Sequence, residues 1–596
     1  MSRAVVLAVI VGFLFSGAVS GAEFEQKWLY AMPNFANEES IQNLMSGMRE
    51  GAKAGVTHVQ VKDPKFGFLE LLGPEYFENI NRVLELADEL DMVVVPVIFP
   101  FGYSGGYLTH DPNLAAGLPV KDAPFVVRNG VAHADPAAAL RVVNNSFEGT
   151  PGSSTINGWS LSDRAEAVVS LDGNDRVDGR TSLRMTGFGD NVRGASVSQR
   201  IPVEPFKYYR LTIWRKTQDF QAGSAAVNIN SNDSRRGRLS YTHLEFNPLQ
   251  DWRAAVTPTS DWQEFQISFN TLESTAINVS VSVGNVRGGT IWWDNMKIEP
   301  AGLANVLRRP IKPLVVKSAD GSRTYMEHRD FEYVYDPLLG NIPNPPGREF
   351  PEDAIFPSNF FDVWHEPPGI TLTPHSRINE GERLLVSYYH PDVIYGQQVL
   401  CSMIDPKIYE LMDDQARRIV DAFNNPKHIM FNHDEIRIGG WEESPDGIER
   451  TPGEILAYNI RRSYEIARKY APEATFYTWS DMFDRYANAR PFEDRNAWYY
   501  LVAGNFDGSW EGLPSDVVIF TWHSRPQTLR WFADRGHKQI LCGYYDGPMQ
   551  RNITRWMTAS EGIPNVVGMM YTTWIDDFSN VEEFFRLVDD YPDWVD

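Results

Sequence analysis

Asp434 and Glu435 stand side by side in the segment HIMFNHDEIR, residues 428–437, where a short apolar run ends. Side chains alternate between the two faces of a strand, so adjacent carboxylates can face the same way only after the strand has ended. Two neighbouring carboxyls oppose each other's ionisation, which separates their pKa values and lets one of them keep a proton near neutral pH. The pair is therefore a candidate for general acid chemistry, and the alternative is a solvated acidic turn.

The segments around this pair alternate between strand and helix patterns. Runs rich in Val and Ile without polar alternation indicate strands that are covered on both faces, as in a parallel sheet. Eight strands are predicted, at residues 28–34, 57–62, 92–99, 428–431, 474–480, 516–522, 538–545 and 565–574. Helical patterns lie between most of them, and the clearest cover residues 38–54, 75–90 and 406–423.

This order predicts an α/β protein, a (β/α)8 TIM barrel that is interrupted after strand 3 by an all-β jelly-roll insertion. A doubly wound open sheet is the alternative, but the glycine-rich phosphate loop of that fold does not follow the first predicted strand. The predicted parts are the first part of the barrel at residues 23–105, an inserted β-sandwich at 142–300, a β-rich region that walls the site at 301–395, and the second, catalytic part of the barrel at 396–596.

The ends of the predicted strands carry acids and aromatic residues. The active site of a TIM barrel lies at the C-terminal ends of its strands, so these side chains should meet there. Carboxylates bind hydroxyl groups, and aromatic rings offer a flat apolar face on which the C–H face of a sugar can stack. We therefore predict that the substrate is bound by Asp63, Trp479, Asp481, Trp522, Trp574 and Asp576.

Composition and charge narrow the class of partner. The chain has 596 residues and a formal net charge of −23. Nucleic acids and anionic membranes attract basic surfaces, so this charge argues against both as partners. Residues 1–22 have the layout of a signal peptide, and their apolar run is too short for a membrane span. We expect a secreted or periplasmic protein. Cys401 and Cys542 are the only cysteines, and two buried free thiols are expected rather than a disulfide scaffold.

Five segments follow one another in the order of a known family. They are LADELDMVVVPVIF, DPKIYELMDDQARRIVDAFNNPKHIMFNHDEI, YTWSDMF, QILCGYYDG and GMMYTTW. In this order they resemble the third helix–strand unit, the acid pair, the fifth-strand Trp segment, the active-site Tyr strand and the closing Trp strand of glycoside hydrolase family 20, the β-N-acetylhexosaminidases. The resemblance covers residues 25–105 and 395–596.

The resemblance implies an exo-acting glycoside hydrolase with a substrate-assisted, retaining mechanism. Glu435 would protonate the glycosidic oxygen, and the 2-acetamido oxygen of the substrate would attack the anomeric carbon. Asp434 would hold the acetamido group, and Tyr545 would donate a hydrogen bond to its oxygen. Such enzymes need no separate carboxylate nucleophile. No cofactor and no catalytic metal are expected, since His433 has no partner at His-x-x-x-His spacing.

Two alternatives remain open. The segment FNHDE is also similar to the fourth-strand acid of other retaining TIM-barrel glycosidases, in which Asp546 or Asp576 would be the nucleophile. The barrel could instead be degenerate, and the protein a non-catalytic carbohydrate binder. All of these interpretations make an oligosaccharide or polysaccharide the expected partner.

The insertion has a sequence pattern of its own. Short alternating strands separated by turns predict a jelly roll. Its start, VVNNSFEGTPGSSTINGWSLS, and its end, GGTIWWDNMKIEP, resemble carbohydrate-binding modules of families 4, 9 and 22. The resemblance implies a structural calcium ion near the ends of the module, with Glu148 and Asp294 as the carboxylates to test. Other sandwiches of this shape are spacers that bind nothing.

Overall fold

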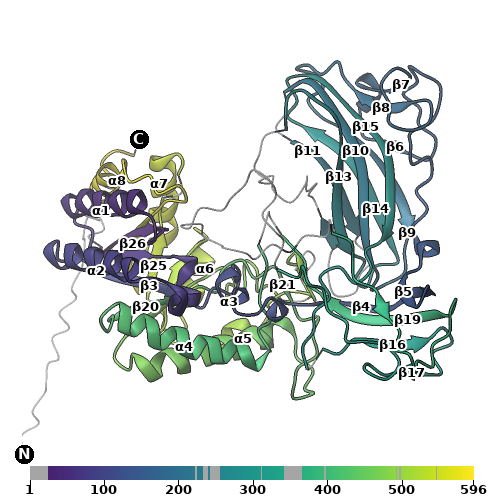
Figure 1. The fold of residues 1–596 in the computed structure, drawn as a ribbon. Coiled ribbons are helices and arrows are strands. Elements are labelled where there is room, and N and C mark those ends of the chain that lie inside the picture. Colours follow the sequence, from purple (N-terminus) through teal and green to yellow (C-terminus); the bar gives the residue numbers. More distant parts are fainter. Residues whose placement is uncertain are drawn as a thin grey trace, which may run out of the picture.

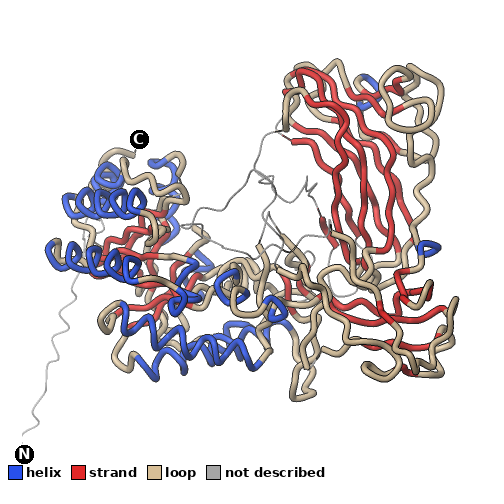
Figure 2. The backbone as a smooth tube through the Cα atoms, viewed as in Figure 1, coloured by secondary structure: helices blue, strands red, loops and turns tan. Residues whose placement is uncertain are grey.

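The computed structural model describes residues 24–221, 224–231, 239–241, 256–310, 312–340, 361, 365–394, 398–491, 493–494, 498–544 and 546–595. The predicted signal peptide and Tyr545 lie outside these residues. Two bodies of different construction are seen, a helix-covered barrel and a region built almost entirely of strands and loops (Figure 1; Figure 2).

Eight parallel strands close into a barrel in the order β1-β2-β3-β20-β22-β24-β25-β26. They are β1 Gln26–Ala31, β2 His58–Val61, β3 Val93–Ile98, β20 His428–Phe431, β22 Thr475–Trp479, β24 Val518–Thr521, β25 Gln539–Cys542 and β26 Val566–Thr572. The prediction of eight parallel strands from apolar runs is confirmed, and large side chains such as Trp28, Tyr477 and Phe520 fill the interior. Several strands end earlier than predicted. After β25 and β26, Asp546 and Asp576 take left-handed backbone angles, with φ of 44° and 49°, which no strand residue adopts.

Helices cover the outside of the barrel. They are α1 Glu38–Lys53, α2 Pro74–Glu89, α4 Pro406–Ala422, α5 Pro452–Tyr470, α6 Pro526–Ala533, α7 Met549–Ser560 and α8 Val581–Asp589. Four of them begin with proline. Proline is favoured in the first turn, because the N–H that it lacks would have no partner within the helix there. Thr451 and Glu454 form a capping box that starts α5. Shorter turns of helix are η1 Pro64–Leu71, α3 Gly105–Leu108, η2 Pro112–Leu114, η3 Pro136–Ala138, η4 Ala165–Ala167 and η6 Ser509–Gly512.

Between β3 and β20 the described residues build three antiparallel sheets. Two five-stranded sheets have the orders β13-β10-β15-β8-β7 and β12-β11-β14-β9-β6, and the third has the order β17-β16-β19-β4-β5-β18. Their strands are β4 Leu118–Arg128, β5 Val131–Ala134, β6 Ser160–Leu161, β7 Val169–Asp172, β8 Ser182–Met185, β9 Ala195–Pro202, β10 Tyr208–Gln221, β11 Ser224–Ser231, β12 Leu239–Tyr241, β13 Ser260–Asn270, β14 Ala276–Gly284, β15 Gly288–Pro300, β16 Val315–Ser318, β17 Thr324–Tyr325, β18 Ile370–Thr371 and β19 Arg383–His390. The first two sheets form the predicted β-sandwich, at the upper right in Figure 1. A further small sheet pairs β21 Ile438–Gly439 with β23 Leu501–Val502.

The third sheet combines strands that come before the sandwich in the sequence with strands that come after it. Strands β4 and β5 precede the sandwich, and β16 to β19 follow it. The region after the sandwich reaches the barrel through Arg309, whose guanidinium lies 3.3 Å from Asp405, and Lys312, which donates to the Glu443 carbonyl at 2.8 Å. That this region walls the active site stays a prediction.

A stem ties the two connections to the barrel together. Ala115 and Cys401 form an antiparallel bridge, and the flanking backbone hydrogen bonds are Ala116 N to Leu400 O at 2.7 Å and Ser402 N to Leu114 O at 2.8 Å. Cys401 and Cys542 are buried free thiols, as predicted. Within the described residues, no helix is both long and apolar enough to cross a membrane.

Candidate active site at the barrel mouth

Strand β20 ends a few residues before the acid pair in the chain. Asn432 and His433 follow the strand and are fully buried. The His433 ring turns toward α5, where its Nε2 lies 2.8 Å from Asn459 Oδ1, and burial lowers its pKa to about 4. His433 is therefore a neutral packing residue. Glu435 has a φ of 49°, a conformation that costs energy in residues other than glycine and is frequent at functional sites.

Two side chains hold the carboxylate of Glu435. Arg437 Nη2 lies 2.5 Å from Glu435 Oε1, and the Tyr103 hydroxyl donates a hydrogen bond to Glu435 Oε2. Gln398 supports the arrangement, because its Nε2 donates to the Glu435 carbonyl at 3.1 Å and its Oε1 accepts from Arg437. A cation and a hydroxyl donor both bind the charged form of a carboxyl. Arg437 and Tyr103 thus hold the Glu435 side chain in one orientation.

Gly102 brings the loop after β3 into contact with the acid pair. A Cβ atom at this position would lie 1.5 Å from the carbonyl oxygen of Asp434, so only glycine fits. The same loop places Tyr103 against Glu435, and Gln398 Nε2 donates to the Gly102 carbonyl at 2.6 Å. Backbone packing thus fixes the position of the Tyr103 hydroxyl.

Asp434 is in a different electrostatic environment from its neighbour. Burial raises its pKa to about 6, the charge of Lys62 opposes this rise, and the charge of Glu435 adds to it. Burial also raises the pKa of Asp481, and the charges of Asp434 and Glu435 raise it further. One Asp481 oxygen is buried without a hydrogen-bond partner among the described residues. Three carboxyls therefore lie near two basic side chains, Lys62 and Arg437, and burial lowers the pKa of Lys62.

A group of aromatic rings reaches this cluster through Tyr30, whose pKa is raised by burial and by the charges of Asp434 and Glu435. The ring centroids of Trp479 and Trp522 are 5.7 Å apart, and those of Trp522 and Trp574 are also 5.7 Å apart. Tyr30 joins the group from β1, with its ring 5.2 Å from that of Trp574 and 5.9 Å from that of Trp479. The three predicted Trp residues are thus brought together, and we call these four residues the aromatic wall.

Tyr30 was not a predicted site residue. Its ring is fully buried, and its hydroxyl has no hydrogen-bond partner among the described residues. Burial raises the pKa of Tyr30, and the nearby charges of Asp434 and Asp576 raise it further. In the sequence Tyr30 is one more apolar residue of a buried strand. Lys62 and Gln398 were missed for a similar reason, since neither stands in a motif.

Asp63, Asp576 and Asp546 accept hydrogen bonds from backbone N–H groups. Asp63 is buried and caps η1, accepting hydrogen bonds at 2.9 Å from the N–H of Phe35, the N–H of Lys65 and the hydroxyl of Tyr76. Both of its oxygens are engaged, so the prediction that Asp63 binds substrate is not supported. Asp576 Oδ1 accepts from Met32 N at 2.9 Å, which ties the end of β26 to β1.

Asp546, the other candidate nucleophile, is exposed and accepts from Trp574 N at 2.6 Å. Tyr545 precedes it and lies outside the described residues.

Glu148 and Asp294, the residues that the resemblance implies for calcium binding in the sandwich, both accept backbone hydrogen bonds. Asp294 is fully buried and accepts backbone hydrogen bonds from Val177 and Asp178, at 2.7 and 3.0 Å, while Glu148 Oε1 accepts from Arg180 N at 2.7 Å. Calcium takes six to eight oxygen ligands, and a calcium ion in the sandwich stays a prediction. Among the described residues, no group of three or more His, Cys, Asp or Glu side chains could hold a metal ion.

Comparisons with known proteins identify one part of the chain. Among curated proteins there is no match. Solved structures similar to this chain include TmCBM61 in complex with beta-1,4-galactotriose. The identity is 17% and the TM-score 0.20, and the match covers 27% of this chain and 98% of that chain. A second is the CBM22-1 xylan-binding domain of Xyn10C from Paenibacillus barcinonensis, with 17% identity, a TM-score of 0.19, and coverage of 26% and 91%.

A rhamnosidase from Novosphingobium sp. PP1Y is also similar, with 9% identity, a TM-score of 0.30, and coverage of 95% of this chain and 58% of that chain. Similarities of this size establish nothing about activity. The resemblance of the barrel to family 20 stays a prediction, whereas residues 141–285, close to the predicted insertion, match the sequence family described as carbohydrate binding domain.

Proposed function

We propose that this protein is a secreted glycoside hydrolase whose (β/α)8 TIM barrel, interrupted after its third strand, cleaves glycosidic bonds at the Asp434–Glu435 pair. The observation that carries the proposal is the contrast within this pair. Glu435 is clamped by Arg437 and Tyr103, and burial raises the pKa of Asp434 to about 6. Two carboxyls in unlike environments form the arrangement that acid-assisted glycoside cleavage requires.

The roles follow from these environments. Asp434 donates its proton to the glycosidic oxygen as the bond to the anomeric carbon breaks, and the alcohol leaves. The carboxylate of Glu435 stabilises the positive charge that develops on the sugar ring. Water then adds to the anomeric carbon and returns a proton to Asp434. This assignment reverses the one implied by the family resemblance, because burial raises the pKa of Asp434, whereas Arg437 and Tyr103 each contact one oxygen of Glu435.

The substrate is proposed to be an oligosaccharide or polysaccharide, attacked from its end. The match of residues 141–285 to a carbohydrate binding domain supports this class of partner, and the aromatic wall supplies rings for stacking. If the sugar carries a 2-acetamido group, its oxygen can attack the anomeric carbon, and no protein nucleophile is needed. The backbone hydrogen bonds of Asp546 and Asp576 weigh against either of them as a nucleophile.

A panel of aryl glycosides, with and without a 2-acetamido group, tests the proposal. Hydrolysis of at least one member is expected, and Asp434→Asn should lower the rate on unactivated glycosides by about 10²–10⁴-fold. The pH profile then assigns the roles. Loss of the alkaline limb in Asp434→Asn supports Asp434 as the acid, and its loss in Glu435→Gln instead restores the assignment implied by the resemblance. An inactive wild-type protein that still binds sugars would support the non-catalytic alternative.

A further inference from the structure

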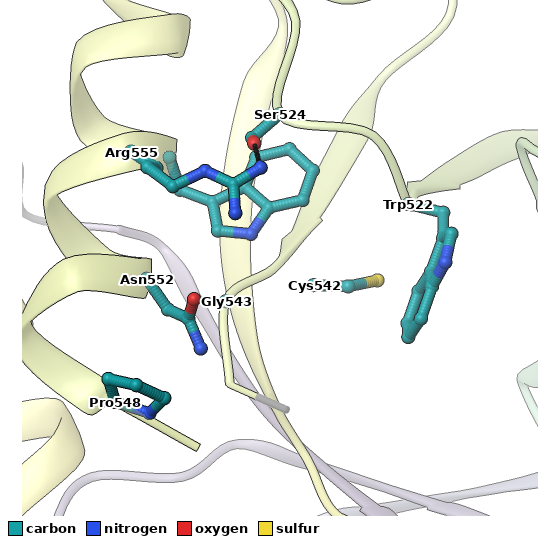
Figure 3. A pocket seen from close by; sticks show the side chains of 8 residues that line it. Trp522, Ser524, Cys542, Gly543, Pro548, Asn552 and Arg555 are labelled. Atoms are coloured by element: carbon teal, nitrogen blue, oxygen red, sulfur yellow. Dashed lines mark hydrogen bonds between the residues drawn. The ribbon is translucent and has the colours of Figure 1, made fainter. Parts of the chain in front are cut away.

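A cavity of about 290 Å³ opens beside the aromatic wall (Figure 3). It is lined by Trp522, Ser524, Cys542, Gly543, Pro548, Asn552, Arg555 and Trp556. Its volume is close to the lower end of the range of about 300–1,000 Å³ for small-molecule sites. Trp522 belongs both to this cavity and to the aromatic wall, so the cavity adjoins the proposed active site.

One wall of the cavity is a single face of α7. Pro548, Asn552, Arg555 and Trp556 follow one another at spacings of four, three and one residues, which places them on the same side of a helix. Figure 3 shows Asn552 on α7 and, across the cavity, the ring of Trp522 with a face turned toward Cys542. The opposite wall therefore consists of the ends of β24 and β25.

The polar groups of this wall are suited to an anion. Arg555 is the one charged side chain among the described residues that line the cavity, and it forms no ion pair with any described residue. Its Nη2 donates to Ser524 Oγ at 2.9 Å, which orients the guanidinium. The Asn552 amide has no hydrogen-bond partner among the described residues and is turned toward the cavity in Figure 3.

The start of α7 also favours an anion in this cavity. Its N-cap residue is Pro548, which makes no side-chain capping hydrogen bond, and the first turn contains no acidic residue. The N-terminal N–H groups of a helix favour negative charge. In a chain whose formal net charge is −23, a cavity with a guanidinium and no carboxylate among its described lining residues is a local exception.

We propose that this cavity is a subsite for a sugar unit that carries an anionic substituent, a carboxylate or a sulfate. Trp522 stacks on the sugar ring, Arg555 pairs with the charged group, and Asn552 binds a hydroxyl or the same anion. The inference deepens the proposed function, on which it rests, because the occupied subsite would hold a charged unit of the substrate next to the acid pair. Substrates of the enzyme would then be acidic glycans.

Calorimetric titration of Glu435→Gln, in which turnover should be slowed under either assignment of roles to the pair, tests the proposal. The probes are methyl β-D-glucuronoside, galactose 6-sulfate, their neutral parents methyl β-D-glucoside and galactose, and inorganic sulfate. At least one charged sugar should bind about tenfold more tightly than its neutral parent, as one charge-assisted hydrogen bond provides. Which charged sugar gains affinity distinguishes a carboxylate from a sulfate.

The added change Arg555→Gln should remove this preference and leave the affinity for the neutral sugar unchanged. Arg551→Gln is the matched control, since Arg551 is an exposed arginine of the same helix that does not line the cavity. Equal affinity for charged and neutral sugars, a preference that survives Arg555→Gln, or inorganic sulfate binding as tightly as the charged sugars would overturn the proposal.

Because the readout is binding, it separates this inference from the proposed function. If wild-type protein hydrolyses no glycoside but the charge preference depends on Arg555, the subsite stands and the hydrolase assignment fails. If the enzyme is active on neutral glycosides and the charge preference is absent, the hydrolase assignment stands and the subsite fails.

Discussion

Arg437 pairs with Glu435 across only two positions of the chain, with Nη2 and Oε1 2.5 Å apart. Such a short-range pair forms because Glu435 has a left-handed backbone conformation, which turns the chain after β20. The second nitrogen of the guanidinium donates to Gln398, which lies two residues before the stem. The acid pair is therefore fixed from its own loop and from the returning chain of the insertion together.

Replacing Arg437 tests this clamp. Arg437→Gln should lower kcat/KM by about tenfold to a hundredfold, the worth of a charge-assisted hydrogen bond. Arg437→Lys should recover part of the loss, because an ammonium keeps the charge but not the planar fork. The control is Arg462→Gln, which breaks an exposed pair with Glu465 that has the same 2.5 Å separation. Equal effects of the two Gln variants on kcat/KM would contradict a specific role for Arg437.

The raised pKa of Asp434 makes stability depend on pH. A buried acid with a folded-state pKa of about 6 binds its proton more tightly than in the unfolded chain, so its contribution to stability is lost as pH rises through 6. Asp434→Asn should flatten this dependence and stabilise the protein at pH 7.5 by on the order of 2 kcal/mol. Urea unfolding at pH 4.5 and 7.5 measures it. The rate of the variant should be about 10²–10⁴-fold lower at both pH values, and a stability whose pH dependence is unchanged from wild type would rule out the buried-acid interpretation.

Gly102 should tolerate no side chain. Gly102→Ala places a Cβ against the Asp434 carbonyl, so we expect a loss of stability of about 1–3 kcal/mol and a displaced acid pair. Thermal unfolding and kcat/KM should both fall. Gly73→Ala is the control, because a Cβ at that position would have no atom within 4 Å. If Gly102→Ala melts with the wild type and keeps its activity, the close backbone contact is not present in solution.

The buried hydroxyl of Tyr30 can be tested by Tyr30→Phe. The ring contacts with Trp479 and Trp574 remain, and a buried polar atom without a described partner is removed. Stability should therefore be unchanged or slightly higher. If the hydroxyl binds substrate next to Asp434, kcat/KM falls about tenfold. Unchanged kinetics together with unchanged melting would make Tyr30 a packing residue only.

Trp574 and Trp479 should respond differently to truncation. Trp479 is 3% exposed, so Trp479→Ala should mainly lower the melting temperature. Trp574 is only partly buried, and Trp574→Ala should raise KM and lower kcat together with a smaller loss of stability. Kinetics and melting curves are compared for the two variants. Equal losses of stability with no change in KM would assign both rings to the core.

The sequence predicted the elements that have a local signal. All eight barrel strands were found because each is an apolar run, and the acid pair because two carboxylates follow such a run. Tyr30 and Gln398 escaped detection, since one looks like a core residue and the other stands in a loop far from the pair in sequence. The capping role of Asp63 was not predicted, because a strand-end acid that caps a 3₁₀ helix has the same sequence signature as one that binds substrate. The sheet that joins β4 and β5 to β19 depends on pairing across more than two hundred residues, which leaves no local pattern.

The insertion also determines the order in which the barrel can be completed during synthesis. Strand β3 ends at residue 98 and its partner β20 begins at residue 428, while β1 pairs with β26, the last strand. The first three strands thus emerge from the ribosome with both outer edges unpaired, and unpaired edges invite association with other chains. The strands of the sandwich pair with one another and can fold in the interval. Closure of the stem then delivers β20 to β3, and the acid pair forms only after this late, long-range step.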